Sequence, residues 1–152
     1  VRNHFSSALQ RMSTVAAVAQ TTGEASHDWV LMKGSPEMVA TLLAEKPKGY
    51  DAAYRKLAEQ GLRIVALAHR QLAPHESARL KDPNSPLTRG EMERGLHFDG
   101  FLAFACPVRT DTPEVIQALR ASSHVVMMAT GDSALTALHV ANEVGIAEGG
   151  LE

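Results

Sequence analysis

The sequence predicts an α+β fold, in which an antiparallel sheet flanked by helices is followed by a shorter α/β segment. Three observations support this prediction. Two strand-like stretches, 14–18 and 29–32, are separated by a polar stretch containing a glycine, as in a hairpin. Two further strand-like stretches, 62–68 and 97–104, enclose a polar region with three prolines. After about Cys106 the pattern changes to helices alternating with a short apolar strand.

The composition is that of a globular chain with no bulk electrostatic partner. Of the 152 residues, 45% are hydrophobic and 21% are charged, which is enough for a core. A net charge of −2 with interspersed signs argues against nucleic-acid binding. No apolar run approaches the roughly 18 residues of a membrane span. We therefore expect a soluble chain, and its start at Val1 rather than Met suggests a piece of a larger protein.

The first segment places an aromatic residue ahead of a strand. Phe5 precedes small residues at 6–8, and 14–18 follow as the strand. An exposed Phe5 could stack on a flat base, whereas the alternative is a phenylalanine packed in the core. The polar stretch 21–28 predicts a hairpin loop, and 29–32 predict the returning strand.

Lys33-Gly34-Ser35-Pro36-Glu37 closes this strand and opens a helix. Ser35 is the expected N-cap and Pro36 the first helical residue, while Gly34 permits a close backbone approach. A lysine beside free helix amides suits phosphate. The alternative is an ordinary strand-to-helix turn with a solvated lysine.

Two helices and a strand are predicted next. The first helix continues through apolar positions to about Lys46, and the second runs over 50–60 with Gly61 as its left-handed cap. The residues expected on their inner faces are Met38, Val39, Leu42, Leu43, Ala53, Tyr54, Leu57 and Ala58. The run 62–68 predicts a strand buried on both faces. Arg63 at its start could clamp a phosphate or reach solvent.

The region 72–95 carries one predicted short helix and no predicted chemistry. Thr88 and Glu91 form the capping box of that helix. The strand 97–104 follows, and the break at 105–109 is the expected boundary between domains 1–105 and 106–152.

The second segment predicts a helix, a strand and another helix. Thr112 is expected to cap a helix that starts at Pro113, with an inner face of Val115, Ile116 and Leu119. A buried strand over 125–129 then leads through the turn 130–133 into a helix with Leu135, Leu138, Ala141 and Val144 inward. Such a strand, tight turn and helix start commonly receives a phosphoryl ligand.

Several common sites are excluded by the sequence. Neither GxxxxGK[ST] nor GxGxxG occurs, and the seven histidines lack metal-ligand spacing, so no protein metal site is predicted. Residues 122–124 are neighbours in the chain and do not form a nucleophile–base pair assembled by the fold. The lone cysteine, Cys106, precludes an internal disulfide and is expected to be a small buried hydrophobe rather than a reactive thiol.

Five motifs together resemble a P-type ATPase over nearly the whole chain. In order they are FSSALQRMS (5–13), KGSPE (33–37), GLRIVALAHR (61–70), CPVR (106–109) and MATGD (128–132). The resemblance implies part of a nucleotide-binding domain at 1–105, and the hinge with part of a haloacid-dehalogenase-like phosphorylation domain at 106–152. FSSALQRMS and the Cys-Pro hinge are most similar to type V pumps of the endoplasmic-reticulum A branch. The lysosomal, polyamine-linked B branch is the alternative.

The resemblance also implies roles for individual residues. Phe5 would stack on adenine, with Met12 near the same pocket, and Lys33 with Gly34 would line the ATP pocket. Arg63 would reach the triphosphate and help to bring the two domains together. In the TGD motif, Thr130-Gly131-Asp132, the threonine would contact the phosphoryl group, and the aspartate would serve the ATP and Mg²⁺ end.

The chain departs from the family pattern in ways that limit its own activity. Cys106 replaces the acidic residue that most P-type pumps have at the hinge, and no DKTGT or GDGxND occurs. We expect weak ATP binding at most, with the chain inactive alone. The resemblance implies a parent that transfers the γ-phosphoryl group of ATP to an aspartate with Mg²⁺, at the cytosolic face of the endoplasmic reticulum membrane, to drive transport or to remove mistargeted transmembrane helices. Its partners would be the remaining domains and membrane helices of that pump.

Two rival functions are left for comparison. One is a non-enzymatic interaction module whose motifs have decayed. The other is a free-standing phosphatase of the dehalogenase type, and the absence of its first-strand aspartate argues against it.

Overall fold

The computed structural model describes residues 1–18 and 26–149. The chain forms two compact units, which we treat separately. The sheet unit comprises Val1–Lys48 and Val65–Leu102, and the helical unit comprises Gly49–Ile64 and Ala103–Glu152.

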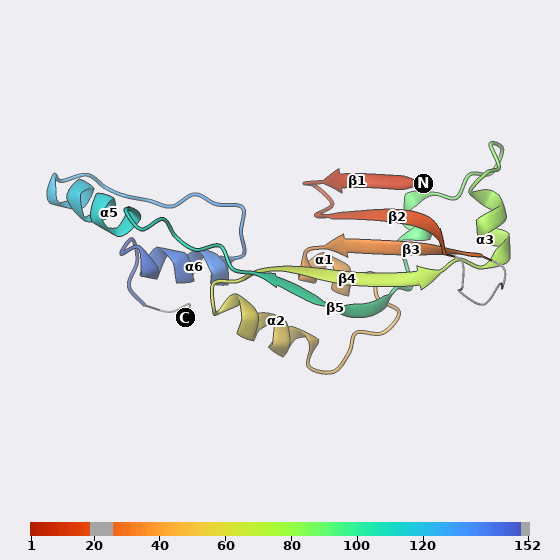
Figure 1. The fold of residues 1–152 in the computed structure, drawn as a ribbon, viewed down its shortest axis with the longest axis horizontal. Coiled ribbons are helices and arrows are strands. Elements are labelled where there is room, and N and C mark those ends of the chain that lie inside the picture. Colours follow the sequence, from red (N-terminus) through yellow and green to blue (C-terminus); the bar gives the residue numbers. More distant parts are fainter. Residues whose placement is uncertain (19–25, 150–152) are drawn as a thin grey trace. The chain divides into compact units, whose positions relative to one another are not determined.

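A five-stranded sheet with the order β1-β2-β3-β4-β5 forms the first part of the fold (Figure 1). Its strands are β1 (Arg2–Ser6), β2 (Arg11–Val18), β3 (His27–Gly34), β4 (Arg63–Gln71) and β5 (His97–Phe104). The pairs β1–β2, β2–β3 and β3–β4 are antiparallel. This confirms the predicted α+β class and antiparallel sheet.

The strand β1 was not predicted, because residues 2–6 lack the apolar alternation of a half-buried strand. It forms through a tight connection to β2, in which the Gln10 N–H donates to the Ser6 carbonyl at 2.7 Å. Gln10 has φ +49°, a conformation suited to such a turn. The predicted strand 29–32 is confirmed within β3. The predicted hairpin loop, 21–28, falls mostly outside the described residues.

Three short helices belong to the sheet unit: α1 (Pro36–Ala40), α3 (Pro74–Arg79) and α4 (Arg89–Met92). The helix α4 was predicted and α3 was not. The helix α1 ends well before the predicted Lys46, because the chain after it pairs with Leu96 instead. The Ala44 N–H donates to the Leu96 carbonyl at 2.8 Å, and the Leu96 N–H donates to Leu42 at 3.0 Å.

The core of the sheet unit lies on one side of the sheet. Alternate residues of β3 and β4 point into it and meet α1, α4 and the segments around them; in Figure 1 α1 lies behind the sheet. The buried cluster is Val30, Met32, Val39, Ala66, Ala68, Leu72, Leu87, Met92 and Leu96. The prediction that β4 is buried on both faces was wrong, because residues between the buried ones are only half-buried.

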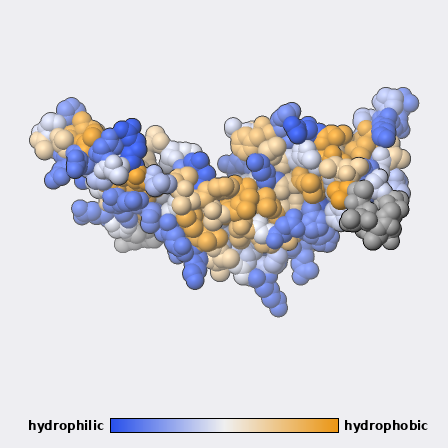
Figure 2. Space-filling view, in the orientation of Figure 1, coloured by the Kyte–Doolittle hydropathy of each residue, from blue (hydrophilic) through white to orange (hydrophobic). Residues whose placement is uncertain are grey.

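We call the opposite side of the sheet the open face, defined by Met12, Leu31, Lys33 and Leu67. These residues occupy the positions between the core residues on β2, β3 and β4. Leu31 is 44% exposed there, and Lys33 is exposed. Figure 2 shows apolar surface over the strands in the same view. The open face is therefore accessible and partly apolar.

The helical unit contains α2 (Tyr50–Ala58), α5 (Thr112–Ala121) and α6 (Ala134–Glu143). Within α2, Ala58 is buried and Leu57 is half-buried as predicted, whereas Ala53 is exposed. Gly61 has φ +74° after this helix, as predicted. A Cβ atom at Gly61 would also collide with the ring of His139, which is a second reason for glycine here.

Three predictions for the end of the chain were wrong. The N-cap of α5 is Asp111, and Thr112 is its first residue. Residues 125–129 form no strand, with Val125 96% exposed and Met127 83% exposed. A buried strand of this kind needs neighbouring strands and helices on both faces, and the described residues place no strand beside 125–129. For the same reason the predicted inner face of α5 contains no buried residue.

The turn into α6 was predicted correctly. The Ser133 side chain caps the helix by accepting from the Thr136 N–H at 3.3 Å. Ala141 and Val144 are buried, so one side of α6 does pack.

Candidate functional site

A β-bulge in β1 places His4 and Phe5 together opposite Met12. On one side of the bulge Asn3 pairs with Ser13, and on the other side Ser6 pairs with Arg11. Two residues of β1, at positions 4 and 5, therefore span the interval that Met12 alone spans on β2.

The same register determines which way Phe5 faces. Ser13 is buried on the core side of the sheet, and Asn3 donates to its hydroxyl at 2.9 Å. Arg11, the partner of Ser6, also faces that side, where it binds Glu93, so Asn3 and Ser6 on the two flanks of the bulge both face the core side. Because neighbouring residues of a strand alternate, His4 next to Asn3 and Phe5 next to Ser6 face the opposite side. Phe5 accordingly lies on the open face, where it is 62% exposed. It is not a core residue.

Met12 in turn pairs with Lys33 of β3, and Lys33 pairs with Leu67 of β4. The result is a row across four strands on the open face, which we call the open-face row: Phe5, Met12, Lys33 and Leu67. Three of the residues predicted to bind ATP thus lie side by side, although they belong to three different strands.

Gly34 ends β3 on the core side and is buried. A Cβ atom there would lie 2.8 Å from both the Gln10 carbonyl oxygen and the Arg11 Cβ. Ser35 next to it donates its N–H to the Gln10 carbonyl at 2.9 Å. Its hydroxyl accepts from the Met38 N–H at 3.3 Å, so Ser35 is the N-cap, as predicted. The close approach that needs Gly34 is thus made by the β1–β2 turn.

In the helical unit, the predicted phosphate residues contact one another. The Arg63 Nε and Nη2 both donate to the Asp132 Oδ1, at 2.9 and 2.5 Å. This hydrogen bonding and the charge of Asp132 raise the pKa of Arg63. The Thr130 hydroxyl donates to the other carboxylate oxygen at 3.2 Å and accepts from the Asp132 N–H at 3.1 Å. The TGD turn and Arg63 thus form one polar cluster.

Contacts between α6 and the end of α2 hold this cluster together. The Thr136 hydroxyl donates to the Leu62 carbonyl at 3.1 Å, immediately before Arg63. His139 bonds the Glu59 carbonyl through its Nδ1 at 3.1 Å. Leu62 and Arg63 are therefore held beside the start of α6 within the helical unit.

Sequence reasoning missed Glu93, which has no exposed side-chain surface. Its carboxylate accepts from the Ser13 hydroxyl, from Arg11 and from Arg89 at 2.6–2.8 Å. Two of these partners lie about 80 positions away in the sequence, so no local pattern could indicate them. Cys106 was also misjudged, because it is exposed rather than buried.

The described residues contain neither a metal-binding cluster nor a membrane-spanning helix. No group of three or more His, Cys, Asp or Glu side chains is arranged to hold a metal ion. No helix within 1–18 and 26–149 is both long and apolar enough to cross a bilayer.

A family model described as the P-type ATPase cytoplasmic domain N matches residues 1–111. The chain belongs to the P-type ATPase family. This confirms the family that the five motifs resemble.

Relatives of this P-type ATPase chain include an endoplasmic reticulum transmembrane helix translocase from Schizosaccharomyces pombe, 40% identical over 149 residues. A probable manganese-transporting ATPase from Arabidopsis thaliana is 37% identical over 145 residues, and a polyamine-transporting ATPase from Mus musculus is 38% identical over 146 residues. These alignments cover 97%, 95% and 93% of the chain, and 12%, 12% and 11% of the three relatives. The chain thus spans about an eighth of the length of such proteins. The relatives include a transmembrane helix translocase and a polyamine-transporting ATPase, which are the two kinds of pump that the type V resemblance implies.

Proposed function

We propose that this P-type ATPase chain is the nucleotide-binding part of a type V pump and that its open-face row receives ATP. In this proposal Phe5 stacks on adenine, Met12 lies against the base, and Lys33 attracts the phosphates. The observation that carries the proposal is the row itself, which joins an exposed aromatic ring, a flexible apolar side chain and an exposed lysine.

The chemistry of the row suits a nucleotide. Stacking of a base on an aromatic ring contributes about 1–3 kcal/mol. A lysine is a compact point charge that binds phosphate without needing a fixed geometry. Phe5 and Lys33 are separated by two strand spacings, about 10 Å, which leaves room for a sugar between a stacked base and the lysine. Gly34 supports the row by letting the β1–β2 turn approach β3.

The cluster in the helical unit is proposed to serve the phosphate end. Arg63 would contact the triphosphate, and the Thr130–Asp132 turn, with Gly131, would contact the phosphoryl group. Mg²⁺ is commonly held by one or two carboxylates together with substrate phosphates, where it offsets their charge. Asp132 supplies one carboxylate of this kind, which fits a metal that arrives with the nucleotide.

We further propose that the parent protein is an ATP-driven membrane pump of the endoplasmic reticulum. The 40% identity to the helix translocases of Schizosaccharomyces pombe and Saccharomyces cerevisiae supports the A branch. The 38% identity to a polyamine-transporting ATPase supports the B branch as the alternative. In either branch, we assign 1–105 to the nucleotide-binding domain and 106–152 to the hinge and part of the dehalogenase-like phosphorylation domain.

The test is an ATP titration of the chain followed by amide NMR shifts. We expect saturable shifts around Phe5, Met12 and Lys33. Lys33→Ala and Phe5→Ala should each weaken binding about tenfold, because each removes one end of the nucleotide contact. Matched controls are Lys56→Ala on α2 and Phe104→Ala on β5, both exposed residues outside the proposed site, which should leave the affinity unchanged.

Flat shifts up to several millimolar ATP would overturn ATP binding by this chain and favour a non-enzymatic interaction module. Equal losses in the control variants would show that binding does not occur at the open-face row.

A further inference from the structure

The buried carboxylate of Glu93 lies on the core side of the sheet, behind the open-face row. Glu93 is the C-cap residue of α4 and its side chain is fully buried. Three donors converge on it: the Ser13 hydroxyl at 2.6 Å, the Arg11 Nε at 2.7 Å and the Arg89 Nε at 2.8 Å. A buried charge is tolerated only when it is paired and hydrogen-bonded in this way.

Within the described residues, the side-chain hydrogen bonds that this network makes outside α4 go to β1 and β2. Ser13 also accepts from the Asn3 side chain at 2.9 Å. Arg89 donates to the Arg11 carbonyl at 3.1 Å and to the His4 carbonyl at 3.4 Å. The residues contacted on β1 are Asn3 and His4, immediately before Phe5.

These contacts fall on both sides of the bulge. The pairs Asn3–Ser13 and Ser6–Arg11 flank it, and Glu93 binds the β2 member of each pair. A bulge leaves backbone groups unpaired and weakens the ladder locally. The ionic network behind it supplies the attachment that the ladder lacks at this point.

We propose that Glu93 is a positioning residue for nucleotide binding, which fixes the β1 bulge, and with it Phe5, from the opposite side of the sheet. The inference rests on the proposed function, because it assigns to Glu93 the orientation of the base-stacking ring. Glu93 does not touch the nucleotide. Lys33 lies on β3 outside the network, so the phosphate contact is independent of Glu93.

The charge of Glu93 is essential to this role. Burial raises the pKa of the Glu93 carboxyl, but the hydrogen bonds from Ser13, Arg11 and Arg89 outweigh burial and leave the pKa below its ordinary value. Glu93 is therefore ionised in the folded chain at neutral pH. A glutamine would keep an acceptor for Ser13 and leave two arginines without their counter-charge.

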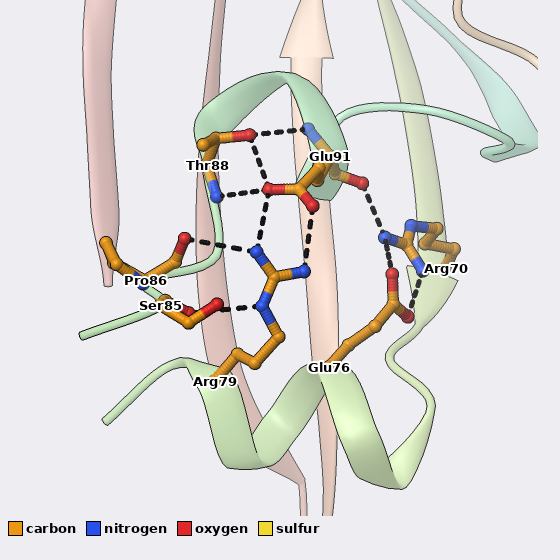
Figure 3. Close-up of polar contacts among 7 residues, drawn as sticks. All are labelled: Arg70, Glu76, Arg79, Ser85, Pro86, Thr88 and Glu91. Carbon is orange, nitrogen blue, oxygen red and sulfur yellow. Dashed lines mark hydrogen bonds and ion pairs between the residues drawn. The ribbon is translucent and has the colours of Figure 1, made fainter. Parts of the chain in front are cut away.

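Glu76 offers a matched control. It is a nearly buried carboxylate paired with Arg70 at 2.8 Å, and it lies in the same region between β4 and β5. Its contacts are with Arg70 and with the Ala73 N–H, and none of them reaches β1 or β2. Figure 3 shows Glu76 on α3 paired with Arg70 of β4.

The experiment compares Glu93→Gln and Glu76→Gln in the chain, at a temperature where both are folded, using two ligands. We expect Glu93→Gln to weaken ATP binding about tenfold and to change the affinity for inorganic tripolyphosphate less than twofold, because only the base contact depends on Phe5. Glu76→Gln should change neither affinity. Equal losses for ATP and tripolyphosphate in Glu93→Gln would overturn the proposal.

A second measurement needs no nucleotide. Amide hydrogen exchange in β1 of the free chain should accelerate in Glu93→Gln by at least tenfold more than exchange in β3, which reports the loss of global stability. Unchanged exchange in β1 would show that Glu93 does not hold the bulge. A wild-type chain that fails to bind ATP would instead overturn the proposed function, so the two failures are distinguishable.

If Glu93→Gln does not fold, Arg89→Ala replaces it. The Arg89 side chain is 25% exposed, and its removal leaves Glu93 bonded to Arg11 and Ser13. Arg89→Ala should weaken ATP binding about threefold and leave the affinity for tripolyphosphate unchanged. An unaltered ratio of the two affinities in Arg89→Ala would contradict the proposal.

Discussion

Gly34 shows how closely packed the end of β3 is. Any side chain at this position would place a Cβ atom 2.8 Å from the backbone oxygen of Gln10 and 2.8 Å from the Arg11 Cβ. Because these are atoms of a paired strand and its turn, they cannot move aside as a flexible side chain would. We expect Gly34→Ala to lower the free energy of unfolding by about 1–3 kcal/mol. Urea denaturation would show this as a lower midpoint with an unchanged slope.

Gly90 on α4 is the matched control for that substitution. A Cβ atom at Gly90 would have no atom within 4 Å, and a helical glycine gains stability when replaced by alanine. Gly90→Ala should therefore leave the midpoint unchanged or raise it slightly. Similar losses in the two variants would show that the contacts of Gly34 are unimportant.

Residues whose partners are near in sequence could be predicted. The Ser35 cap, the left-handed Gly61 and the Thr88–Glu91 capping box all depend on contacts within a few residues. Glu93 depends on Ser13, 80 positions away, so its role could not be predicted. Phe5 and Lys33 were singled out from their residue types and from the family resemblance, and their binding of ATP stays a prediction. The bulge that brings Phe5 and Lys33 into one row is not visible in the sequence.

At the scale of elements, two arginine–carboxylate pairs hold α3: Arg70 of β4 pairs with Glu76 of α3, and Arg79 of α3 pairs with Glu91 of α4 (Figure 3). Arg70 donates to both oxygens of Glu76 at 2.8 Å and to the Glu91 carbonyl at 2.7 Å. Arg79 of α3 donates to the Glu91 carboxylate of α4 at 2.8 Å. A polar region with little apolar content is thereby fixed against the sheet. This explains why α3 forms although its sequence lacks an apolar face.

Acid should weaken this attachment. The hydrogen bonds from Arg70, together with that from the Ala73 N–H, outweigh burial and lower the pKa of Glu76 from 4.5 to about 2. The pKa of the folded state thus lies below that of the unfolded state. The stabilisation is fully present above about pH 5 and is lost as the pH falls from 4.5 towards 2. Its size is on the order of 2–3 kcal/mol.

The measurement is the free energy of unfolding at pH 6 and pH 3, in the wild type and in Glu76→Gln. The wild type should lose more stability over this interval, since glutamine cannot titrate. Glu91, whose pKa is lowered to about 2 chiefly by Arg79, should contribute in the same direction in both proteins and cancel in the comparison. An equal pH dependence in the two proteins would contradict the assignment to Glu76.

Elements whose length depends on distant pairing were predicted poorly. The helical spacing after Pro36 continues to Leu43, yet α1 stops at Ala40 because Leu96 pairs with the following residues. The apolar run 125–129 has the composition of a buried strand but has no neighbouring strand among the described residues. The composition of a segment indicates which secondary structure it can form, and the presence of pairing partners decides whether that structure forms.

At the scale of the whole molecule, the two units differ in how completely they are packed. The sheet unit buries a continuous cluster on one side of its sheet, built from residues of β3, β4 and their connections. The α+β class was predictable because the strands and helices that complete this cluster all lie within the chain. In the helical unit α5 buries no residue, and the exposed apolar side chains of Val115, Leu119, Val125 and Met127 lie in or just after it.

This difference predicts the pattern of amide hydrogen exchange across the chain. Protection reflects the free energy of the opening that exposes each amide, and core elements open only with global unfolding. Amides of β3 and β4 around Val30 and Ala66, both with 0% exposure, should exchange slowest. The helix α6, which buries Ala141 and Val144, should be intermediate. The helix α5 should exchange close to the rate of an unstructured peptide, because ten residues without packing are too few for a stable helix.

Hydrogen exchange measured by NMR at neutral pH checks this order directly. The Arg120 guanidinium of α5 donates to the Ile146 carbonyl at 2.7 Å, so Arg120→Ala tests whether that contact retains the helix. A single exposed hydrogen bond contributes little, and the variant should exchange like the wild type in α5. If the amides of α5 are as protected as those of β3, the apolar side chains of α5 are covered in solution. That result would contradict the conclusion that the helical unit is less completely packed than the sheet unit.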